Sequence, residues 1–593
     1  MPLELKNLHV IDDQSFDYVF ERDVDIPLKT TKPAFEGDPL IVRANVYRPK
    51  KPGRRFPVLV TYGPYGKDIP YSQFHAASFA EVNPKHKSTH SAWEVPDPLF
   101  WTSNDYVVVR ADERGTGNSP GFLDSMSSGT CDGFADVIEW CADQPWSSGR
   151  VGLLGISYYA GSQWRAAARN PKGLACIIPW EEWWYDRQVG SNQYGLGGRT
   201  ERNWGTDSLE GVLSAEELSR YRAEQPVDCA NNRYRDDVYF ASRDFKLSDV
   251  KVPVLSVANW GGIHLHLRGN VLGYLGVGSE FKYLRFITGR HDLPFFYDEE
   301  VKVQKSFLDA CLKGDDPGGW LSTTPGSLPP VSLYVRQGNP GFNDAEAERL
   351  AFPRRAEWEW PIARTVYTNY HLRAAGEMST TPPPPTTVTT ASGKGTVSYE
   401  APKGRKVFKT PPFTERCEIT GHPTARLSVS LSPSSREEEG PSTTPTDMDI
   451  FLTLRHYDRR GTEIFYTGAV GDPVPVVRGW LRLSLRSLTS QPTFLSDVVP
   501  ERDYLSTDLQ PVEIGKVYTV DVEIWPTCVV VEAGEALALE VSSCDSPEGV
   551  SLFGHNHPDD RAESVFKGYN HLHVGGSEYE SYLRLPIVPP RVG

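Results

Sequence analysis

One serine, placed between a strand pattern and a helix pattern, limits the folds open to this chain. Residues 151–154 form an apolar run typical of a buried strand, and residues 160–170 are typical of a helix that ends before a proline. Between them lies Gly-Ile-Ser-Tyr-Tyr, residues 155–159. A serine on a sharp strand-to-helix turn exposes its hydroxyl, and the next amide N–H points at the same space. Ser157 is therefore a candidate nucleophile. Tyr159 replaces the second glycine of the common Gly-x-Ser-x-Gly motif, so the pentapeptide alone also fits an ordinary turn serine.

The first half of the chain has the pattern of an α/β protein. Its short apolar runs lack polar alternation, as expected for strands that are buried on both faces of a mostly parallel sheet. These runs are residues 57–62, 106–110, 151–154, 174–178, 252–257 and 284–287. Ligands bind such sheets at the carboxyl ends of the strands. We therefore expect catalytic residues directly after these runs.

A helical insertion separates the fourth run from the fifth. Residues 180–250 contain patterns such as 214–221, where a serine N-cap precedes acidic residues of a first helical turn. We expect this segment to be a cap over the active site. The α/β core is then expected to comprise residues 1–179 and 251–330.

The second half, residues 331–593, is typical of a β domain. Residues 449–456 and 518–524 alternate between apolar and polar side chains, and glycine and proline turns are frequent. Many short strands with such turns indicate a sandwich or jelly roll. Two low-complexity stretches, residues 379–393 and 432–445, are expected to be exposed loops.

The composition excludes several classes of protein. A chain of 593 residues is long enough for two or three domains, and its net charge of -15 argues against binding to nucleic acid or to an anionic membrane surface. No apolar stretch reaches the roughly 18 residues that a membrane span needs, and the first residues lack a signal pattern. The eight cysteines are scattered without a C-x-x-C pair, which favours reduced thiols in a cytoplasmic protein and gives no zinc spacing.

Further motifs occur in order around the serine. They are residues 63–67 (Gly-Pro-Tyr-Gly-Lys), 112–121, 132–140, 144–152, 570–576 and a last strand at 581–586. In order and spacing, this set resembles the CocE/NonD serine hydrolases, the cocaine esterase-like relatives of X-Pro dipeptidyl peptidases, over nearly the whole chain. The resemblance implies an α/β-hydrolase core with a jelly-roll domain packed beside it.

A nucleophilic serine needs a base and a carboxylate that orients the base. Of the 14 histidines only His291 lies just after the last core strand, and it matches the position of the family's base. The family carries its aspartate in a turn where this chain has Gly262. We therefore look for the acid after the strand that follows the nucleophile helix. There the candidates are Glu181 first, then Glu182, then Asp186, and each could instead be a carboxylate on the cap surface.

The remaining site residues would bind the oxyanion and the substrate. The turn itself supplies the N–H of Tyr158, and the resemblance implies that the phenol of Tyr65 is the second donor. Four tryptophans are candidate substrate-binding residues that would contact an acyl group and exclude water, or they serve only in packing. These are Trp180, Trp183, Trp184 and Trp260.

The sequence thus predicts a serine hydrolase or acyl transferase that forms an acyl-enzyme on Ser157 with a small-molecule ester, amide or thioester. No metal or organic cofactor is implied. Three alternatives stay open: a biosynthetic enzyme that transfers or cyclises acyl groups, an X-Pro dipeptidyl peptidase, and a non-catalytic ligand-binding relative. The family resemblance and an exposed β domain are compatible with a homodimer, although the sequence indicates no interface.

Overall fold

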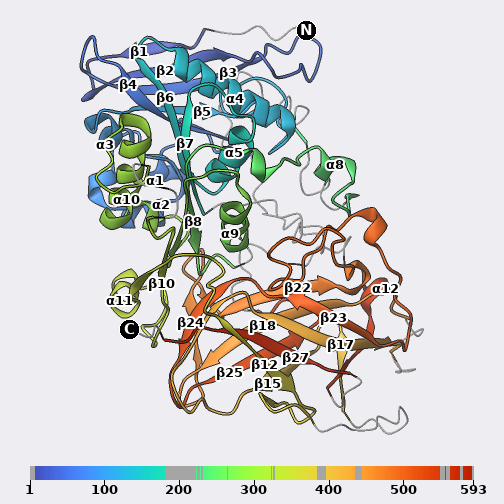
Figure 1. Ribbon diagram of the computed structural model, residues 1–593. Helices are drawn as coiled ribbons and strands as arrows, with labels where there is room; N and C mark the ends of the chain where they lie inside the picture. Colours follow the sequence, from blue (N-terminus) through green and yellow to red (C-terminus); the bar gives the residue numbers. More distant parts are fainter. Residues whose placement is uncertain are drawn as a thin grey trace.

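The protein is described here from a computed structural model (Figure 1). The described residues are 7–181, 222–223, 228, 231–263, 265–321, 324, 327–383, 395–434, 444–547, 555, 561–574 and 579–590. Most of the expected cap, including the predicted helix at 214–221, lies outside these residues. Figure 1 shows an α/β part and, below it in the view, a part made almost entirely of strands.

The α/β part is built on one large sheet. Its eleven strands among the described residues lie in the order β1-β2-β3-β5-β4-β6-β7-β8-β9-β10-β11. The seven strands from β5 to β10 in this order run parallel to one another, whereas β3 beside β5 and β11 beside β10 are antiparallel. The bounds are β1 Val10–Asp12, β2 Tyr18–Pro27, β3 Ile41–Pro49, β4 Phe56–Gly63, β5 Val107–Asp112, β6 Ser147–Ile156, β7 Leu174–Trp180, β8 Val254–Asn259, β9 Lys282–Ile287, β10 Val331–Tyr334 and β11 Arg354–Glu357. All six apolar runs of the sequence are strands of this sheet, which confirms the α/β prediction.

Helices cover both faces of the sheet, because successive side chains of a buried strand point to opposite faces. On one face, Val58 and Val60 of β4 share a core cluster with Phe134 of α4 and Trp164 of α5. On the other face, Leu59 of β4 lies in a cluster with α3 and α10. The helix bounds are α1 Tyr71–Phe74, α2 Ala76–Glu81, α3 Pro98–Ser103, α4 Ser128–Asp143, α5 Tyr158–Ala167, α8 Val238–Ala241, α9 Leu267–Gly276, α10 Asp298–Leu308, α11 Ala345–Ala351 and α12 Glu563–Phe566. Short helical turns lie at η1 Pro84–His86, η3 Leu247–Asp249, η4 Pro294–Phe296, η5 Asp309–Lys313, η7 Leu483–Leu485 and η8 Ser506–Asp508.

The first sheet continues past residue 330, where the sequence suggests a domain boundary. Strand β10 pairs in parallel with β9, and β11 pairs antiparallel with β10. The segment that connects the two parts therefore begins as two further strands of the α/β sheet before the chain enters the β domain.

The second part is an antiparallel β domain, as the alternating pattern predicts. Its described strands form a nine-stranded, a five-stranded and a two-stranded sheet. Residues of β17 in the first of these and of β18 in the second share one hydrophobic core, so the two larger sheets pack on each other. The bounds are β12 Val366–Leu372, β13 Met378–Ser379, β14 Thr396–Ala401, β15 Arg405–Lys409, β16 Cys417–Gly421, β17 Thr424–Ser432, β18 Asp449–Tyr457, β19 Glu463–Ile464, β20 Tyr466–Thr467, β21 Pro473–Val474, β22 Val477–Arg482, β23 Tyr518–Glu523, β24 Thr527–Val531, β25 Ala536–Ser542, β26 Gly568–His573 and β27 Tyr582–Ile587.

The two parts contact each other directly. Arg268 of α9 makes a two-pronged ion pair with Glu523 of β23, at 2.7 and 3.0 Å. The backbone N–H of His291 donates to the carbonyl oxygen of Ala469 in the β domain at 2.8 Å. Because His291 is the candidate base, the β domain helps to position a residue of the candidate site.

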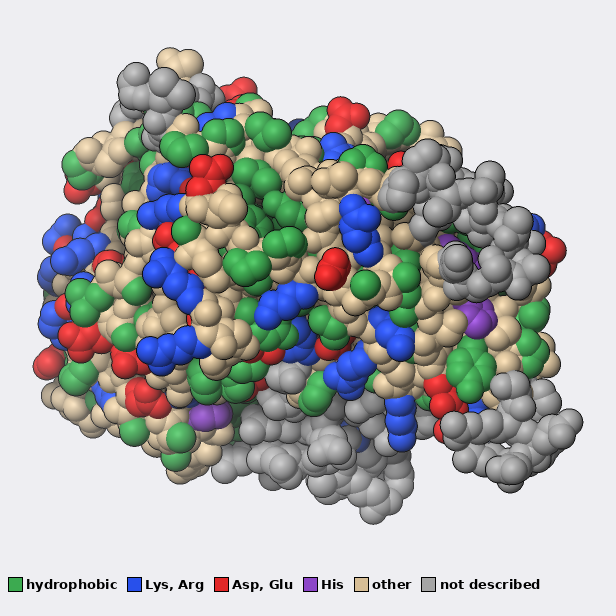
Figure 2. All heavy atoms as spheres, turned by 90° about the horizontal axis from the view of Figure 1, so that it is seen from below, with side chains coloured by type: hydrophobic (Ala, Val, Ile, Leu, Met, Phe, Trp, Pro, Cys, Tyr) green, Lys and Arg blue, Asp and Glu red, His purple; other side chains and the backbone are tan. Residues whose placement is uncertain are grey.

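The surface seen from below carries charges of both signs. In Figure 2 lysine and arginine side chains are interspersed with aspartate and glutamate over this face. Within the described part of the chain, no helix is long and apolar enough to cross a membrane.

Candidate active site

Ser157 occupies a strained turn between β6 and α5. Its φ of 57° and ψ of -120° are unusual for a residue with a side chain, and such strain persists only where the surroundings hold it. Its N–H is held by the carbonyl oxygens of Trp180 and Glu181, at 3.0 and 2.9 Å. A Cβ at Gly155 would lie 2.6 Å from Cβ of Tyr159, so this tight turn requires glycine at that position. The sequence motif thus folds as the sharp turn that it predicts.

His291 follows β9 and makes a hydrogen bond with each ring nitrogen. Nδ1 lies 3.1 Å from Oε2 of Glu181, and Nε2 lies 2.9 Å from Oε1 of Glu94. The ring also stacks on His266, with 4.8 Å between the ring centroids. Burial lowers the pKa of His291, but the two carboxylates outweigh it and raise the pKa to about 10. The imidazole therefore favours its protonated form, which donates to both carboxylates.

Glu181 is the acid that the structure brings to the histidine. It is the first residue after β7, is fully buried and has a φ of 45°. Burial raises its pKa to about 7, against the opposing effect of the neighbouring His291. Glu182 and Asp186, the less favoured candidates, lie outside the described residues.

Asn259 takes part in the site, and sequence reasoning missed it. Its Nδ2 donates to Oε1 of Glu181 at 3.1 Å and to the carbonyl oxygen of Gly289 at 2.8 Å. Asn259 thereby joins the acid to the loop that carries His291. Gly262, three residues on, brings no carboxylate to the site: its backbone N–H donates to the Asn259 carbonyl at 3.0 Å, and its own carbonyl accepts from the backbone N–H of His266 at 3.0 Å. The sequence did contain a signal for Asn259, because it is a polar residue at the carboxyl end of the buried strand β8.

The two expected oxyanion donors lie beside Ser157. Tyr65 follows β4, and its buried ring packs edge-on against Tyr158 and Tyr159, the two residues after Ser157. Burial and the charge of Glu94 raise the pKa of Tyr65, so the phenol keeps its proton at neutral pH. Tyr158 is the first residue of α5, where backbone N–H groups have no partner within the helix. Both groups can donate to an oxygen next to Ser157.

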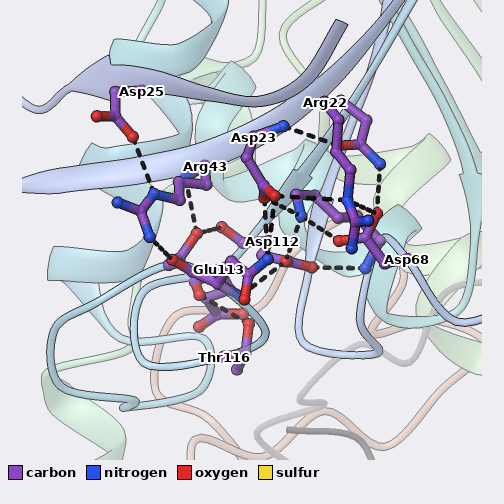
Figure 3. A network of polar contacts seen from close by, with 12 residues as sticks. Arg22, Asp23, Asp25, Arg43, Asp68, Asp112, Glu113 and Thr116 are labelled. Atoms are coloured by element: carbon purple, nitrogen blue, oxygen red, sulfur yellow. Dashed lines mark hydrogen bonds and ion pairs between the residues drawn. The ribbon is translucent and has the colours of Figure 1, made fainter. Parts of the chain in front are cut away.

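A buried ionic network holds the loop that carries Tyr65 (Figure 3). Nζ of Lys67 lies 2.6 Å from Asp23, 2.5 Å from Asp68 and 3.4 Å from Asp112. The backbone N–H of Lys67 also donates to Asp112 at 2.6 Å. Burial opposes the charge of Lys67, but the three carboxylates outweigh it and raise the pKa of the lysine. The loop that carries Tyr65 is thus held by a charged cluster at the end of β5.

Glu94 was not predicted, because it lies in a segment without a motif. Its carbonyl oxygen accepts from the N–H of Ile156 at 3.0 Å, which places the residue at the end of β6. The residue is 2% exposed, and burial raises the pKa of its carboxyl. Among the described residues, Ser157 and His291 share no hydrogen bond, and Glu94 occupies the ring nitrogen of His291 opposite Glu181. Only the folding of the chain brings this carboxyl to the site.

The structure places Trp180 and Trp260 in the core. Trp180 is fully buried and packs edge-on against Phe295, at 5.4 Å between ring centroids. Trp260 stacks on Phe286 at 3.9 Å, and its indole N–H donates to the carbonyl of Tyr334. Neither indole presents surface to a ligand, which corrects the expectation that these two side chains bind substrate. Trp183 and Trp184 lie outside the described residues.

Comparison with family models agrees with this architecture. Residues 38–267 match the X-Pro dipeptidyl-peptidase (S15 family) model, and residues 325–584 match the X-Pro dipeptidyl-peptidase C-terminal non-catalytic domain. The first match contains Ser157, and the second covers most of the β domain.

Individual proteins are similar over most of the chain. Cocaine esterase from Rhodococcus sp. (strain MB1 Bresler) is 24% identical, and the alignment covers 85% of this chain and 92% of that protein. The structure of a CocE/NonD family hydrolase from Staphylococcus aureus is 25% identical with a TM-score of 0.79, covering 98% of this chain and 96% of that chain. An α-amino acid ester hydrolase, 16% identical, shares the fold with a TM-score of 0.65 over 98% of each chain. With both family models matched in order and these relatives similar along their length, the chain is a CocE/NonD-like hydrolase of the S15 peptidase family.

Proposed function

We propose that this protein is a serine hydrolase that cleaves an ester of a small molecule through an acyl-enzyme on Ser157. The observation that carries the proposal is the meeting of three groups at one edge of the sheet. Ser157 follows β6, Glu181 follows β7, and His291 follows β9. The carboxyl ends of neighbouring parallel strands are where such sheets bind ligands.

The residues suggest a two-step reaction. Oγ of Ser157 attacks the carbonyl carbon and loses its proton to the acid–base group built around His291. The N–H of Tyr158 and the phenol of Tyr65 donate to the oxygen that becomes negative. The carbon–oxygen bond to the leaving alcohol then breaks, and the alcohol departs with a proton. Water attacks the acyl-enzyme in the second step and frees Ser157.

The relatives favour an ester as the substrate, since one is named an esterase and another an ester hydrolase. Transfer of the acyl group to an alcohol or amine, in place of water, would use the same acyl-enzyme. The second candidate is cleavage of an X-Pro dipeptide, which the two matched family models favour. Release of a chromogenic amine from a Gly-Pro amide, measured beside 4-nitrophenyl acetate hydrolysis, separates the two substrate classes.

Labelling with a fluorophosphonate probe tests whether Ser157 is an activated nucleophile. We expect the wild type to be labelled and Ser157→Ala to be unlabelled, because the probe bonds to the serine oxygen. His291→Ala and Glu181→Gln should label at least about 100-fold more slowly, the usual contribution of acid–base assistance. Asp447→Asn, which changes a half-buried carboxyl of the β domain whose pKa is also raised, is the control and should label at the wild-type rate. A folded wild type that resists the probe would refute the proposal.

A further inference from the structure

The imidazole of His291 is contacted at its edge and on its face. At the edge, Nδ1 lies 3.1 Å from Oε2 of Glu181, and Nε2 lies 2.9 Å from Oε1 of Glu94. On the face, the ring of His266 stacks on the imidazole with 4.8 Å between the ring centroids and 27° between the planes. The proposed reaction explains why a carboxylate lies at the edge, but it assigns no part to His266.

We propose that His266 is a positioning residue, whose ring holds the imidazole of His291 at the angle that acid–base catalysis at Ser157 requires. The inference deepens the proposed function and rests on it, because it concerns the base of that reaction. In this role His266 acts through His291 and exchanges no proton with the substrate.

The contact with the ring face restricts a motion that the two edge contacts leave open. Both hydrogen bonds of His291 are made by its ring nitrogens, so the ring can still rock about the line that joins Nδ1 and Nε2. A second ring that lies nearly parallel against the face blocks this motion, because rocking would push the two rings into each other. The stack therefore fixes the tilt of the imidazole, and with it the direction in which Nε2 can donate or accept a proton.

The charge of His291 strengthens the stack. Glu181 and Glu94 favour the protonated imidazole, and a cation is attracted to the face of an aromatic ring that lies within about 6 Å. This attraction is larger where water is excluded, and both His266 and His291 are buried. The aromatic face of His266 thus suits the protonated state of its neighbour.

The backbone of His266 is itself held in place, as a positioning residue requires. Its N–H donates to the carbonyl oxygen of Gly262 at 3.0 Å, within the turn that follows β8. The next residue, Leu267, is fully buried in a core cluster that includes strands of the β domain. Arg268 then forms the ion pair with Glu523 of β23. The start of α9 therefore presents the ring of His266 to His291 from a fixed position.

The variants His266→Leu and His266→Phe test the inference, because both remove the imidazole but only phenylalanine restores a flat ring. We expect kcat for 4-nitrophenyl acetate to fall at least about tenfold in His266→Leu, with KM within about threefold of the wild type, since small misplacements of catalytic groups cost large factors in rate. His266→Phe should keep kcat at least about fivefold above that of His266→Leu, because its ring can stack on the imidazole. The control is His371→Leu, which removes a buried histidine of β12 that contacts the ring of Tyr582 and should keep the wild-type kcat.

A second readout reports on the stack without any measurement of activity. In proton NMR of the wild type with labelled histidines, the carbon-bound ring protons of His291 should be shifted upfield, because they lie over the face of an aromatic ring. The shift should persist in His266→Phe and disappear in His266→Leu. The measurement on the wild type stands even if both variants fail to fold.

Three results would overturn the inference. They are a wild type without the upfield shift, a folded His266→Leu with wild-type kcat, and a folded His266→Phe that is no more active than His266→Leu. Wild-type activity in Ser157→Ala would instead overturn the proposed function itself.

Discussion

At the scale of single residues, the site depends on charges that are removed from water. His291 and Glu181 are both buried, and each shifts the pKa of the other. Ion pairs of this kind rely on close geometry, because desolvation costs several kcal/mol per ion. Asn259 and Glu94 supply the remaining hydrogen bonds of the pair. The candidate active site is therefore a connected cluster, and a change in any member is expected to alter the protonation of the others.

The raised pKa of His291 predicts a pH-dependent contribution to stability. The folded protein holds the proton up to a pKa of about 10, whereas an unfolded histidine loses it near its ordinary value of 6.5. This contribution is complete below pH 6.5 and is lost as the pH rises toward 10. We expect the difference in unfolding temperature between wild type and His291→Gln to shrink steadily from pH 8 to pH 10. Scanning calorimetry over this range checks it, and a constant difference would show that His291 is not protonated in the folded state.

At the scale of elements, the turn after β8, the loop that carries His291 and the end of β20 come together at the candidate catalytic base, His291. The turn after β8 contains Gly261, and a Cβ there would lie far inside van der Waals contact with the carbonyl oxygen of Thr467. Thr467 ends β20, two residues before Ala469, whose carbonyl holds the backbone of His291. The β domain thus approaches the site through one short segment, and only glycine permits the approach.

The substitution Gly261→Ala should therefore disturb the site from a distance. The added methyl group must move either the turn or the segment from Thr467 to Ala469, and with it the backbone of His291. We expect kcat for 4-nitrophenyl acetate to fall at least about tenfold, since small misplacements of catalytic groups cost large factors in rate. The control is Gly129→Ala in α4, whose methyl would meet only Oγ of Ser127, at 3.9 Å. Equal rates for the two variants would show that the approach of β20 does not position the base.

At the scale of the whole molecule, the two parts form one functional unit. The ion pair between Arg268 and Glu523 joins α9 to β23, and Arg268 is 1% exposed. The indole of Trp260 packs between β9 and the connecting segment, against Phe286 and Trp360. The connecting segment therefore contacts the start of the turn that follows β8, and the β domain contacts the helix α9 after that turn.

Removing the charge of Glu523 tests how strongly the two parts depend on each other. Glu523→Gln breaks the two-pronged ion pair with the buried Arg268, and breaking a buried pair by removing one charge costs about 3–5 kcal/mol. We expect a lower unfolding temperature together with lower esterase activity, because docking also holds the backbone of His291. Glu513→Gln, which breaks an exposed pair with Lys516, serves as the control and should change neither quantity. Full activity in a destabilised Glu523→Gln would separate docking from catalysis.

The sequence by itself determined the elements and their order. Apolar runs fix buried strands through local periodicity, and the turn at Ser157 and the loop at His291 follow from their positions at strand ends. The family resemblance added the order of the two domains.

Only the tertiary structure decided which charges meet. Glu181 was the first of three candidate acids, whereas Glu94 and Asn259 were not among the candidates, because no local pattern links them to His291. The tertiary structure also decided that Trp180 and Trp260 are core residues. A sequence pattern does not distinguish an aromatic side chain that lines a pocket from one that packs between two layers. Periodicity acts over a few residues, but the partners of a buried charge are set by distance in space.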